Sequence, residues 1–196
     1  VENTIGTFAL PLATAVNFQC NGKDVLIPMV IEEPSVVAAL SNMAQLTRKS
    51  DGFFAESDKS IMIGQIQIPN VIDFSKTISI LEANKSDLLD RADRIHPKLK
   101  ERGGGICEMS FRHLVYDEPN EPKQNIVVVH FTLDCVDAMG ANMVNTIAEE
   151  LSPHIERLIG QPTRLRILSN YATERCSRAW CSIPVELLYK KNKPQK

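Results

Sequence analysis

The 196-residue sequence has few aromatic side chains, at 6% of residues, and no excess of either charge. Its 22 Lys and Arg against 24 Asp and Glu leave a formal net charge of −2, so it lacks the cationic surface of a non-specific nucleic-acid binder. No apolar run approaches the ~18 residues that span a bilayer, and the N-terminal residues do not resemble a signal peptide. We therefore expect neither nucleic acid nor a membrane as a partner.

Metal-binding and redox motifs are absent as well. The five cysteines form no CxxC pair, and the four histidines show no HxH or HExxH spacing. We therefore expect no metal site, and the odd number of cysteines favours reduced thiols in a cytoplasmic protein. What the sequence does have is 43% hydrophobic residues, which is typical of a globular protein with a sizeable core.

The first sixty residues predict a hairpin followed by a helix. Asn21-Gly22 is a strong signal for a two-residue turn, and it joins the predicted strands Ala13–Cys20 and Lys23–Ile31. Apolar residues then recur at helical spacing over Ser35–Arg48. Gly52 and the Ser- and Asp-rich stretch to Ser60 are expected to end this helix.

Residues 61–168 predict the order β-α-β-β-α-β, which is the ferredoxin-like split βαβ arrangement with an antiparallel sheet. The expected elements are a strand at Ile61–Ile68, a helical region at Asp73–Leu99 broken before Pro97, strands at Ile106–Tyr116 and Ile126–Val136, a helix capped by Asp137 and ending at Gly160, and a strand at Arg164–Leu168. The chain is therefore expected to have an α+β fold.

Three segments make up the predicted domain organisation. Residues 1–60 start one domain, 61–168 form the inserted split βαβ module, and 169–196 return to the first domain through a strand at Arg178–Ile183. The chain starts without methionine and ends on a basic tail that caps no element, so we expect it to be a fragment.

Two glycine-containing segments could approach a ligand. Asp137-Ala-Met-Gly-Ala-Asn142 lies where a strand gives way to a helix, a position that favours an anion such as a dinucleotide phosphate. A capped helix packed tightly on a sheet explains the same residues. Gly103–Gly105 likewise fits either a bend that needs positive φ or a close approach to a ligand.

Charged residues mark two further candidates. Glu32 and Glu33 precede Pro34 at a helix start, where they either complement the helix dipole or supply a partly desolvated carboxyl group for proton transfer. His96 lies within a basic run that is either a solvated helix end or a phosphate contact. The run consists of Arg91, Arg94, Lys98, Lys100 and Arg102.

Five motifs in order give the chain a family resemblance. They are Glu2-Asn-Thr-Ile-Gly6, Glu32-Glu-Pro-Ser35, Gly103-Gly-Gly105, Asp137-Ala-Met-Gly-Ala-Asn142 and Arg166-Ile-Leu-Ser-Asn170. Together they resemble 3-hydroxy-3-methylglutaryl-coenzyme A reductase, in particular the soluble, bacterial-type class II enzymes. The resemblance covers essentially the whole chain and implies that the inserted module is the NAD(P)-binding domain.

The resemblance also implies an activity and the residues that carry it. The reaction is the four-electron reduction of hydroxymethylglutaryl-CoA to mevalonate and CoA, or its reverse. Glu33 matches the catalytic proton donor, Ser35 a substrate contact, and Glu2–Gly6 the motif of a dimer whose active site forms at the subunit interface. The residues that match cofactor-binding segments are Asp137, Met139, Gly140, Ala141, Asn142 and Asn170.

The chain departs from the family pattern in two ways. No motif for the family's catalytic lysine, aspartate and flap histidine occurs before Lys196, so this chain alone is expected to be inactive. His96 stands about where NAD-preferring relatives have an acidic residue, which predicts a preference for NADPH. The alternative hypothesis is a non-catalytic nucleotide-binding module with a ferredoxin-like fold.

Overall fold

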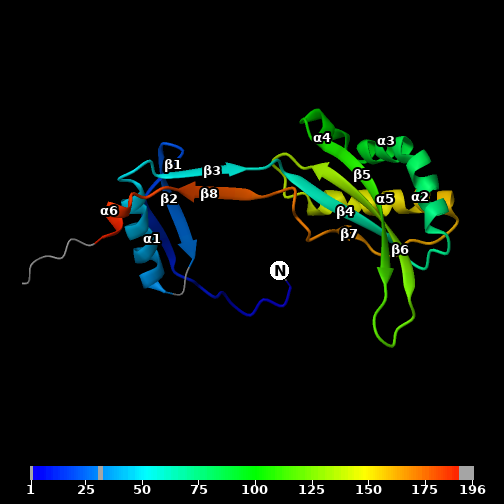
Figure 1. Cartoon of the computed structure of the whole chain (residues 1–196), viewed down its shortest axis with the longest axis horizontal. Helices are drawn as coiled ribbons and strands as arrows, with labels where there is room; N and C mark the ends of the chain where they lie inside the picture. The colour runs from blue at the N-terminus through cyan, green and yellow to red at the C-terminus, as the bar shows by residue number, and fades with distance from the viewer. Residues whose placement is uncertain (1, 31–32, 190–196) are drawn as a thin grey trace, which may run out of the picture. The chain divides into compact units, whose positions relative to one another are not determined.

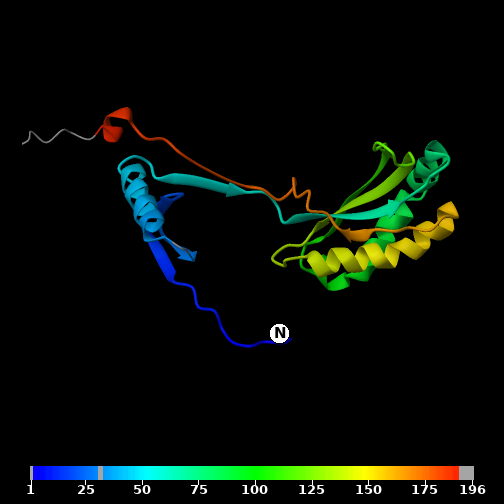
Figure 2. The ribbon, with the colours of Figure 1, turned by 90° about the horizontal axis from the view of Figure 1, so that it is seen from below.

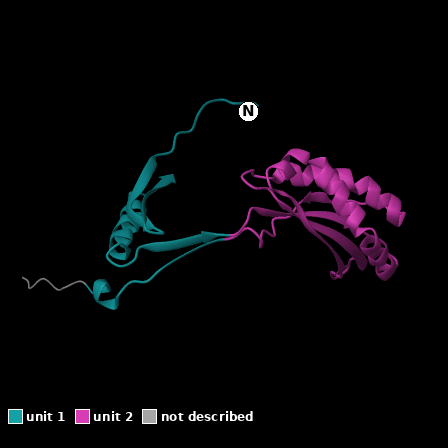
Figure 3. Ribbon diagram, turned by 90° about the horizontal axis from the view of Figure 1, so that it is seen from above, with its two compact units in different colours: residues 1–57, 177–196 teal, residues 58–176 magenta. Residues whose placement is uncertain are grey.

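The computed structural model describes residues 2–30 and 33–189 (Figure 1). It divides into two compact units, coloured in Figure 3: unit 1 comprises residues 1–57 and 177–196, and unit 2 comprises residues 58–176. Residues 58–60 and 169–176 therefore belong to unit 2, and not to the flanking segments in which the sequence interpretation placed them. In the described part of the chain, no helix combines the length and apolar character needed to cross a bilayer.

Unit 1 is built on a four-stranded sheet in the order β2-β1-β3-β8. The predicted hairpin is confirmed, with Asn21 and Gly22 both at positive φ (49° and 74°), as a type I′ turn requires. The predicted helix is confirmed as α1, which packs on β1. The elements are β1 Leu12–Cys20, β2 Lys23–Val30, α1 Pro34–Thr47, β3 Phe53–Ser57, β8 Ser177–Cys181 and α6 Val185–Leu188.

The strand β3 was not predicted, because the sequence interpretation assigned to Gly52 and the stretch to Ser60 only the end of the preceding helix. It is a strand because β8 pairs with it along its whole length, from Phe53 opposite Cys181 to Ser57 opposite Ser177. Phe54 and Trp180 stack across this pair with ring centroids 6.1 Å apart. The return of the C-terminal segment thus creates a strand that the local sequence alone does not signal.

Unit 2 has a fully antiparallel sheet in the order β5-β6-β4-β7. The helices α2, α3 and α5 pack on one face of it, and Figure 2 shows α5, in yellow, running beneath the strands. The elements are β4 Ile61–Ile68, α2 Phe74–Ala83, α3 Lys85–Ile95, α4 Pro97–Glu101, β5 Gly105–Tyr116, β6 Gln124–Asp134, α5 Ala141–Ile159 and β7 Arg166–Leu168. The element order is the predicted β-α-β-β-α-β, with its first helical part divided.

Three helices replace the region expected at Asp73–Leu99. The predicted break before Pro97 is confirmed, because Pro97 is the first residue of α4. The break at Asn84 was not predicted: Asn84 ends α2, where its side-chain amide donates to the Ile80 carbonyl, and it also precedes α3. The divided region brings the end of α3 and the start of α4 close to the end of β6.

A carboxylate ties the C-terminal end of α5 to the segment that leads into β7. Glu156 Oε1 accepts hydrogen bonds from the Thr163 backbone N–H and hydroxyl, both at 2.8 Å. These bonds, the backbone one first, lower the pKa of Glu156. A carboxyl pKa lowered by folding contributes stability above the unfolded value of about 4.3, and this stability is lost as pH falls through the folded pKa.

We therefore expect Glu156→Gln to destabilise unit 2 most near neutral pH. Urea unfolding at pH 7 and pH 3.5 should show that the stability difference from wild type narrows at the lower pH, because the Glu156 carboxyl of the unfolded wild-type chain is then largely protonated and the advantage of its lowered native pKa is partly lost. Glu150→Gln, an exposed change on the same helix, is the control. A difference of equal size at both pH values would contradict the expectation.

Candidate functional site

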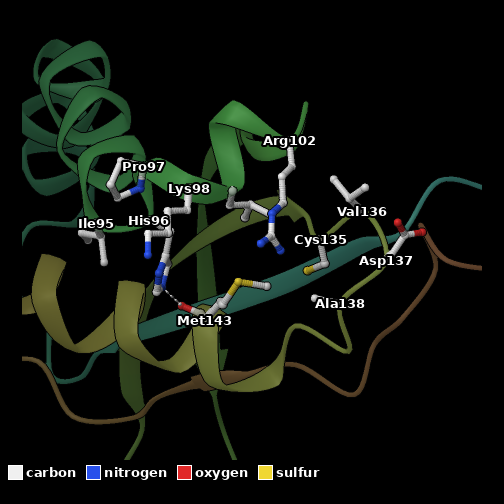
Figure 4. A pocket seen from close by; sticks show the side chains of 11 residues that line it. Ile95, His96, Pro97, Lys98, Arg102, Cys135, Val136, Asp137, Ala138 and Met143 are labelled. Atoms are coloured by element: carbon white, nitrogen blue, oxygen red, sulfur yellow. Dashed lines mark hydrogen bonds between the residues drawn. The ribbon is translucent and has the colours of Figure 1, made fainter.

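A pocket of about 750 Å³ lies in unit 2 between the α3–α4 junction and the connection from β6 to α5 (Figure 4). One side carries the basic or ionisable residues His96, Lys98 and Arg102. Val136 and Asp137 line the other side. The pocket therefore joins two of the predicted candidate segments, the basic run and the segment that starts at Asp137.

His96 fixes the junction of α3 and α4 against α5. Its half-buried ring lies with Nε2 3.3 Å from the carbonyl oxygen of Met143, in the first turn of α5 (Figure 4). Because a carbonyl oxygen only accepts hydrogen bonds, Nε2 must carry the proton in this contact. The histidine thus holds the two walls of the pocket together.

The helix α5 begins differently from the sequence prediction. Gly140, and not Asp137, is its N-cap, while Asp137 is exposed three residues earlier. Within the described residues no side-chain cap is formed at Gly140, so the first-turn N–H groups, including those of Ala141 and Asn142, have no side-chain acceptor there. An uncapped helix start beside a basic pocket wall is suited to an anionic group such as a phosphate.

Gly140 is required for this arrangement. It has φ 90°, and an added Cβ would lie 2.3 Å from Cys135 Sγ and 2.7 Å from Met62 Sδ. Burial raises the pKa of the Cys135 thiol, which therefore remains protonated near neutral pH. The connection is thus packed directly onto two sulfur atoms and leaves no space for a side chain at position 140.

The structure separates the basic residues that the sequence grouped together. Arg91 Nε pairs with Asp87 at 2.7 Å, and Lys100 pairs with Asp93. Lys98 and Arg102 line the pocket and form no ion pair within residues 2–30 and 33–189. In Figure 4 the Arg102 side chain extends from the end of α4 toward the pocket. Arg102 is therefore a free guanidinium for a bound anion.

Other predicted residues lie elsewhere in unit 2. Met139 is 69% exposed beside the pocket, and Asn142 is exposed on the first turn of α5. Asn170 is exposed beyond β7 and does not line the pocket. Its neighbours Ser169 and Tyr171 line a separate groove of about 500 Å³, on strand residues facing away from the helices.

Glu33 and Ser35 lie in unit 1, at the start of α1. The Ser35 hydroxyl donates to Glu33 Oε1 at 2.5 Å, and both residues are exposed. The partial desolvation that the sequence interpretation invoked for this carboxyl group is therefore not present in the described part of unit 1. Glu32, the other carboxylate of the predicted pair, lies outside the described residues.

Sequence reasoning missed one residue that contacts the candidate segment. Arg175 Nη1 donates to the carbonyl oxygen of Met139 at 3.2 Å. No spacing or motif in the sequence marks this arginine, because it reaches the connection only through the loop after β7. Among the residues that the structure describes, no cluster of three or more His, Cys, Asp or Glu could hold a metal ion.

Comparison with known proteins identifies one family. The profile of hydroxymethylglutaryl-coenzyme A reductase matches residues 1–195. The chain is 44% identical over 179 residues to the 3-hydroxy-3-methylglutaryl-coenzyme A reductase of Archaeoglobus fulgidus, covering 91% of this chain and 40% of the relative. It is 35% identical over 183 residues to a probable reductase of Borreliella burgdorferi, covering 91% of this chain and 39% of the relative.

Solved structures give the same result. The class II reductase of Streptococcus pneumoniae bound to NADPH in open conformations is 34% identical, with a TM-score of 0.86 over 97% of this chain and 45% of that chain. A second structure of the reductase from this organism also has a TM-score of 0.86, over 98% of this chain and 50% of that one. The chain thus spans at most half the length of these relatives.

Proposed function

The chain belongs to the hydroxymethylglutaryl-coenzyme A reductase family, and we propose that it supplies the cofactor-binding module and part of the substrate-binding domain of an NADPH-dependent reductase. The reaction is the four-electron conversion of 3-hydroxy-3-methylglutaryl-CoA to mevalonate and CoA, or its reverse. Unit 2, a ferredoxin-like split βαβ module, takes the cofactor. Unit 1 starts the substrate-binding and dimerisation domain.

The observation that carries this proposal is the unit 2 pocket with its uncapped helix and free cations. The N-terminal turn of α5 offers backbone N–H groups for a phosphate, while His96 and Arg102 line the facing wall. The segment that would lie along the dinucleotide consists of Asp137, Met139, Gly140, Ala141 and Asn142. Asn170 lies outside this pocket and is proposed as a further cofactor contact on the family resemblance alone. The residues present therefore fit a dinucleotide phosphate.

Preference for NADPH follows from the charge of the pocket wall. The 2′-phosphate distinguishes NADPH from NADH, and a guanidinium binds such a group through two parallel N–H donors. Arg102 has no competing ion pair in the described residues, and Lys98 adds a second positive charge nearby. An acidic residue in place of His96 would repel the same phosphate.

The proposed chemistry assigns roles to unit 1. NADPH, when bound, would supply the hydride for reduction of the thioester and then of the aldehyde. Glu33 would give a proton to the carbonyl oxygen, and Ser35, whose hydroxyl already bonds the Glu33 carboxylate, would contact the hydroxymethylglutaryl group. The resemblance places a catalytic lysine, aspartate and histidine beyond Lys196, so turnover is proposed for the whole enzyme and cofactor binding for this chain.

We propose a homodimer as the working form. The motif Glu2–Gly6 is exposed and belongs to no helix or strand, and the Ile5 side chain is fully exposed. An apolar side chain in such a segment is suited to burial against a second subunit. In the reductase family the active site forms between subunits, so dimerisation would bring a cofactor module to a substrate-binding domain.

NADPH titration of the 196-residue chain tests the cofactor assignment. We expect saturable binding, and we expect Arg102→Ala to weaken NADPH binding about 10- to 100-fold, because a charge-assisted hydrogen bond is lost. Binding of NADH, which has no 2′-phosphate, should change little. The enhancement of NADPH fluorescence on binding measures both affinities.

Arg91→Ala is the matched control, because Arg91 belongs to the same basic run but is bonded to Asp87 on α3. Its affinity for NADPH should equal that of the wild type. Equal losses from the two variants would show that the overall positive charge of the run, and not Arg102, holds the phosphate. Absence of NADPH binding by the wild-type chain would refute the proposed function.

A further inference from the structure

The connection between β6 and α5 contains a strained residue, Val136. Its φ is 52°, in the left-handed region, which a β-branched side chain avoids because of steric contact with its own backbone. Such a conformation persists only where surrounding contacts impose it, and it tends to occur at functional sites. Val136 lines the pocket and immediately precedes the segment that starts at Asp137.

Asp134 provides the contact that imposes this conformation. Its Oδ1 accepts a hydrogen bond from the Val136 backbone N–H at 3.0 Å, which is the pattern of an Asx turn. Backbone bonds on either side complete the corner: the Cys135 N–H donates to the Ser60 carbonyl at 2.9 Å, and the Ala138 N–H donates to the Cys135 carbonyl at 3.0 Å. The corner at residues 134–138 is thus held by three hydrogen bonds.

The glycine run, which sequence reasoning left open between a bend and a ligand approach, packs against this corner. A Cβ on Gly104 would lie 2.5 Å from the Asp134 carbonyl oxygen and 2.7 Å from Val136 Cγ2. A side chain at position 104 would therefore displace the corner. The structure explains the middle glycine as space for residues 134–136 and not as a ligand contact.

The direction of the chain after the corner decides where the pocket wall lies. Val136, Asp137 and Ala138 all line the pocket, whereas Asp134 does not and acts only through the Val136 N–H. Without that acceptor, Val136 would be released toward the extended or right-handed conformations that its side chain prefers. The wall would then leave the position in which it meets the start of α5.

We infer that Asp134 is a positioning residue for the dinucleotide: its carboxylate holds Val136 in the left-handed conformation and so presets the pocket wall for binding. The inference rests on the proposed function and adds a residue that is not among those lining the pocket. A hydrogen-bond acceptor is what the position needs, and negative charge is not. Asparagine should therefore replace Asp134, whereas alanine should not.

NADPH affinities of the 196-residue chain, of three variants at position 134 and of one control variant test this inference. We expect Asp134→Ala to weaken NADPH binding about tenfold, the usual cost of leaving a polar group without its partner. Asp134→Asn should stay within about twofold of wild type, and Asp134→Ser, which offers a weaker acceptor, should fall between them. Asp117→Ala, a loop carboxylate paired with Lys123, is the control and should leave the affinity unchanged.

The affinities of the position-134 variants either support or overturn the role proposed for Asp134. If Asp134→Ala does not fold, Asp134→Ser still tests the need for a hydrogen-bond acceptor, because its NADPH affinity should be lower than that of the wild type and of Asp134→Asn. Equal losses of NADPH affinity in Asp134→Ala and Asp134→Asn would overturn the inference, because the charge would then matter. Unchanged affinity in all three position-134 variants would overturn it as well. Hydrogen exchange at the Val136 amide should accelerate in Asp134→Ala and not in Asp134→Asn. A wild-type chain that binds no NADPH would refute the proposed function and this inference with it.

Discussion

Gly140→Ala is expected to abolish measurable NADPH binding and to destabilise unit 2 by about 2–4 kcal/mol. Two effects add at this position. The φ of 90° is strained for any residue with a Cβ, and that Cβ would lie 2.3 Å from Cys135 Sγ and 2.7 Å from Met62 Sδ. Relieving either contact moves the start of α5, which carries the N–H groups proposed to bind phosphate.

Gly160→Ala separates the two effects. Gly160 lies at the other end of the same helix with φ 69°. A Cβ added there would meet no described atom within 4 Å, so the Gly160→Ala variant has the backbone strain without the steric contact. Its destabilisation should be about 1 kcal/mol, with NADPH affinity unchanged. Urea unfolding and NADPH titration of both variants measure the difference. Equal behaviour of the two would show that the contact with Cys135 and Met62 is unimportant.

The secondary structure of unit 2 was largely predictable because its signals are local. The alternation over Ile61–Ile68 matches β4 residue for residue, and its even-numbered apolar side chains Ile66 and Ile68 are fully buried. The strand β3 was not predictable in this way. Its residues become a strand by pairing with β8, which lies more than a hundred residues later in the chain, and no local pattern reports such a partner.

The start of α5 was predicted incorrectly for a related reason. Asp137 is a good capping residue by type, but the left-handed Val136 and the hydrogen bond from the Ala138 N–H to the Cys135 carbonyl delay the helix. The cap then falls at Gly140, where the sulfur atoms beneath leave no space for a side chain. Residue type gives the capping preference, whereas the packing beneath the loop decides the position.

The candidate site was predictable in outline but not in its distribution of charge. The sequence indicated a phosphate contact in the basic run around His96 without distinguishing its members. One signal was available, because Asp87 and Arg91 are four residues apart on a helix and such pairs attract. The pairing of Lys100 with Asp93 crosses from α4 to α3 and depends on the break before Pro97. The contact of Arg175 with Met139 depends on the fold alone.

The apolar side chains of the first hairpin in unit 1 are not buried as those of β4 are. Leu12, Leu26 and Val30 of the first hairpin are 60% exposed or more, whereas the hydrophobic core cluster consists entirely of residues of unit 2. Exposed apolar side chains that gather on one element are typical of surfaces for association. This agrees with the proposed roles of unit 1 in substrate binding and dimerisation. Since the core cluster lies in unit 2, we expect most of the folding stability of the described chain to come from unit 2.

Gly64→Ala tests whether the core of unit 2 carries the stability of the described chain. Gly64 lies in the central strand β4 opposite Phe131 of β6, and its Cβ would be 2.2 Å from Phe131 Cζ and 2.6 Å from the two neighbouring ring carbons. The fully buried ring has no space to withdraw, so unit 2 must distort. We expect a loss of about 3 kcal/mol, at the upper end for overpacking, measured by urea unfolding.

Phe131→Leu identifies the cause of that loss. On its own this change leaves a cavity and should cost about 1–3 kcal/mol, but it removes the ring atoms that a Cβ at position 64 would meet. The double variant should therefore be more stable than the sum of the two single losses predicts, with a coupling of at least ~1 kcal/mol. Strictly additive losses would mean that the glycine serves backbone freedom and not the ring. Because Gly64 does not line the pocket, the NADPH affinity of the folded double variant should stay near that of the wild type. This result would show that the stability of the sheet and the binding of NADPH at the β6–α5 connection depend on different residues.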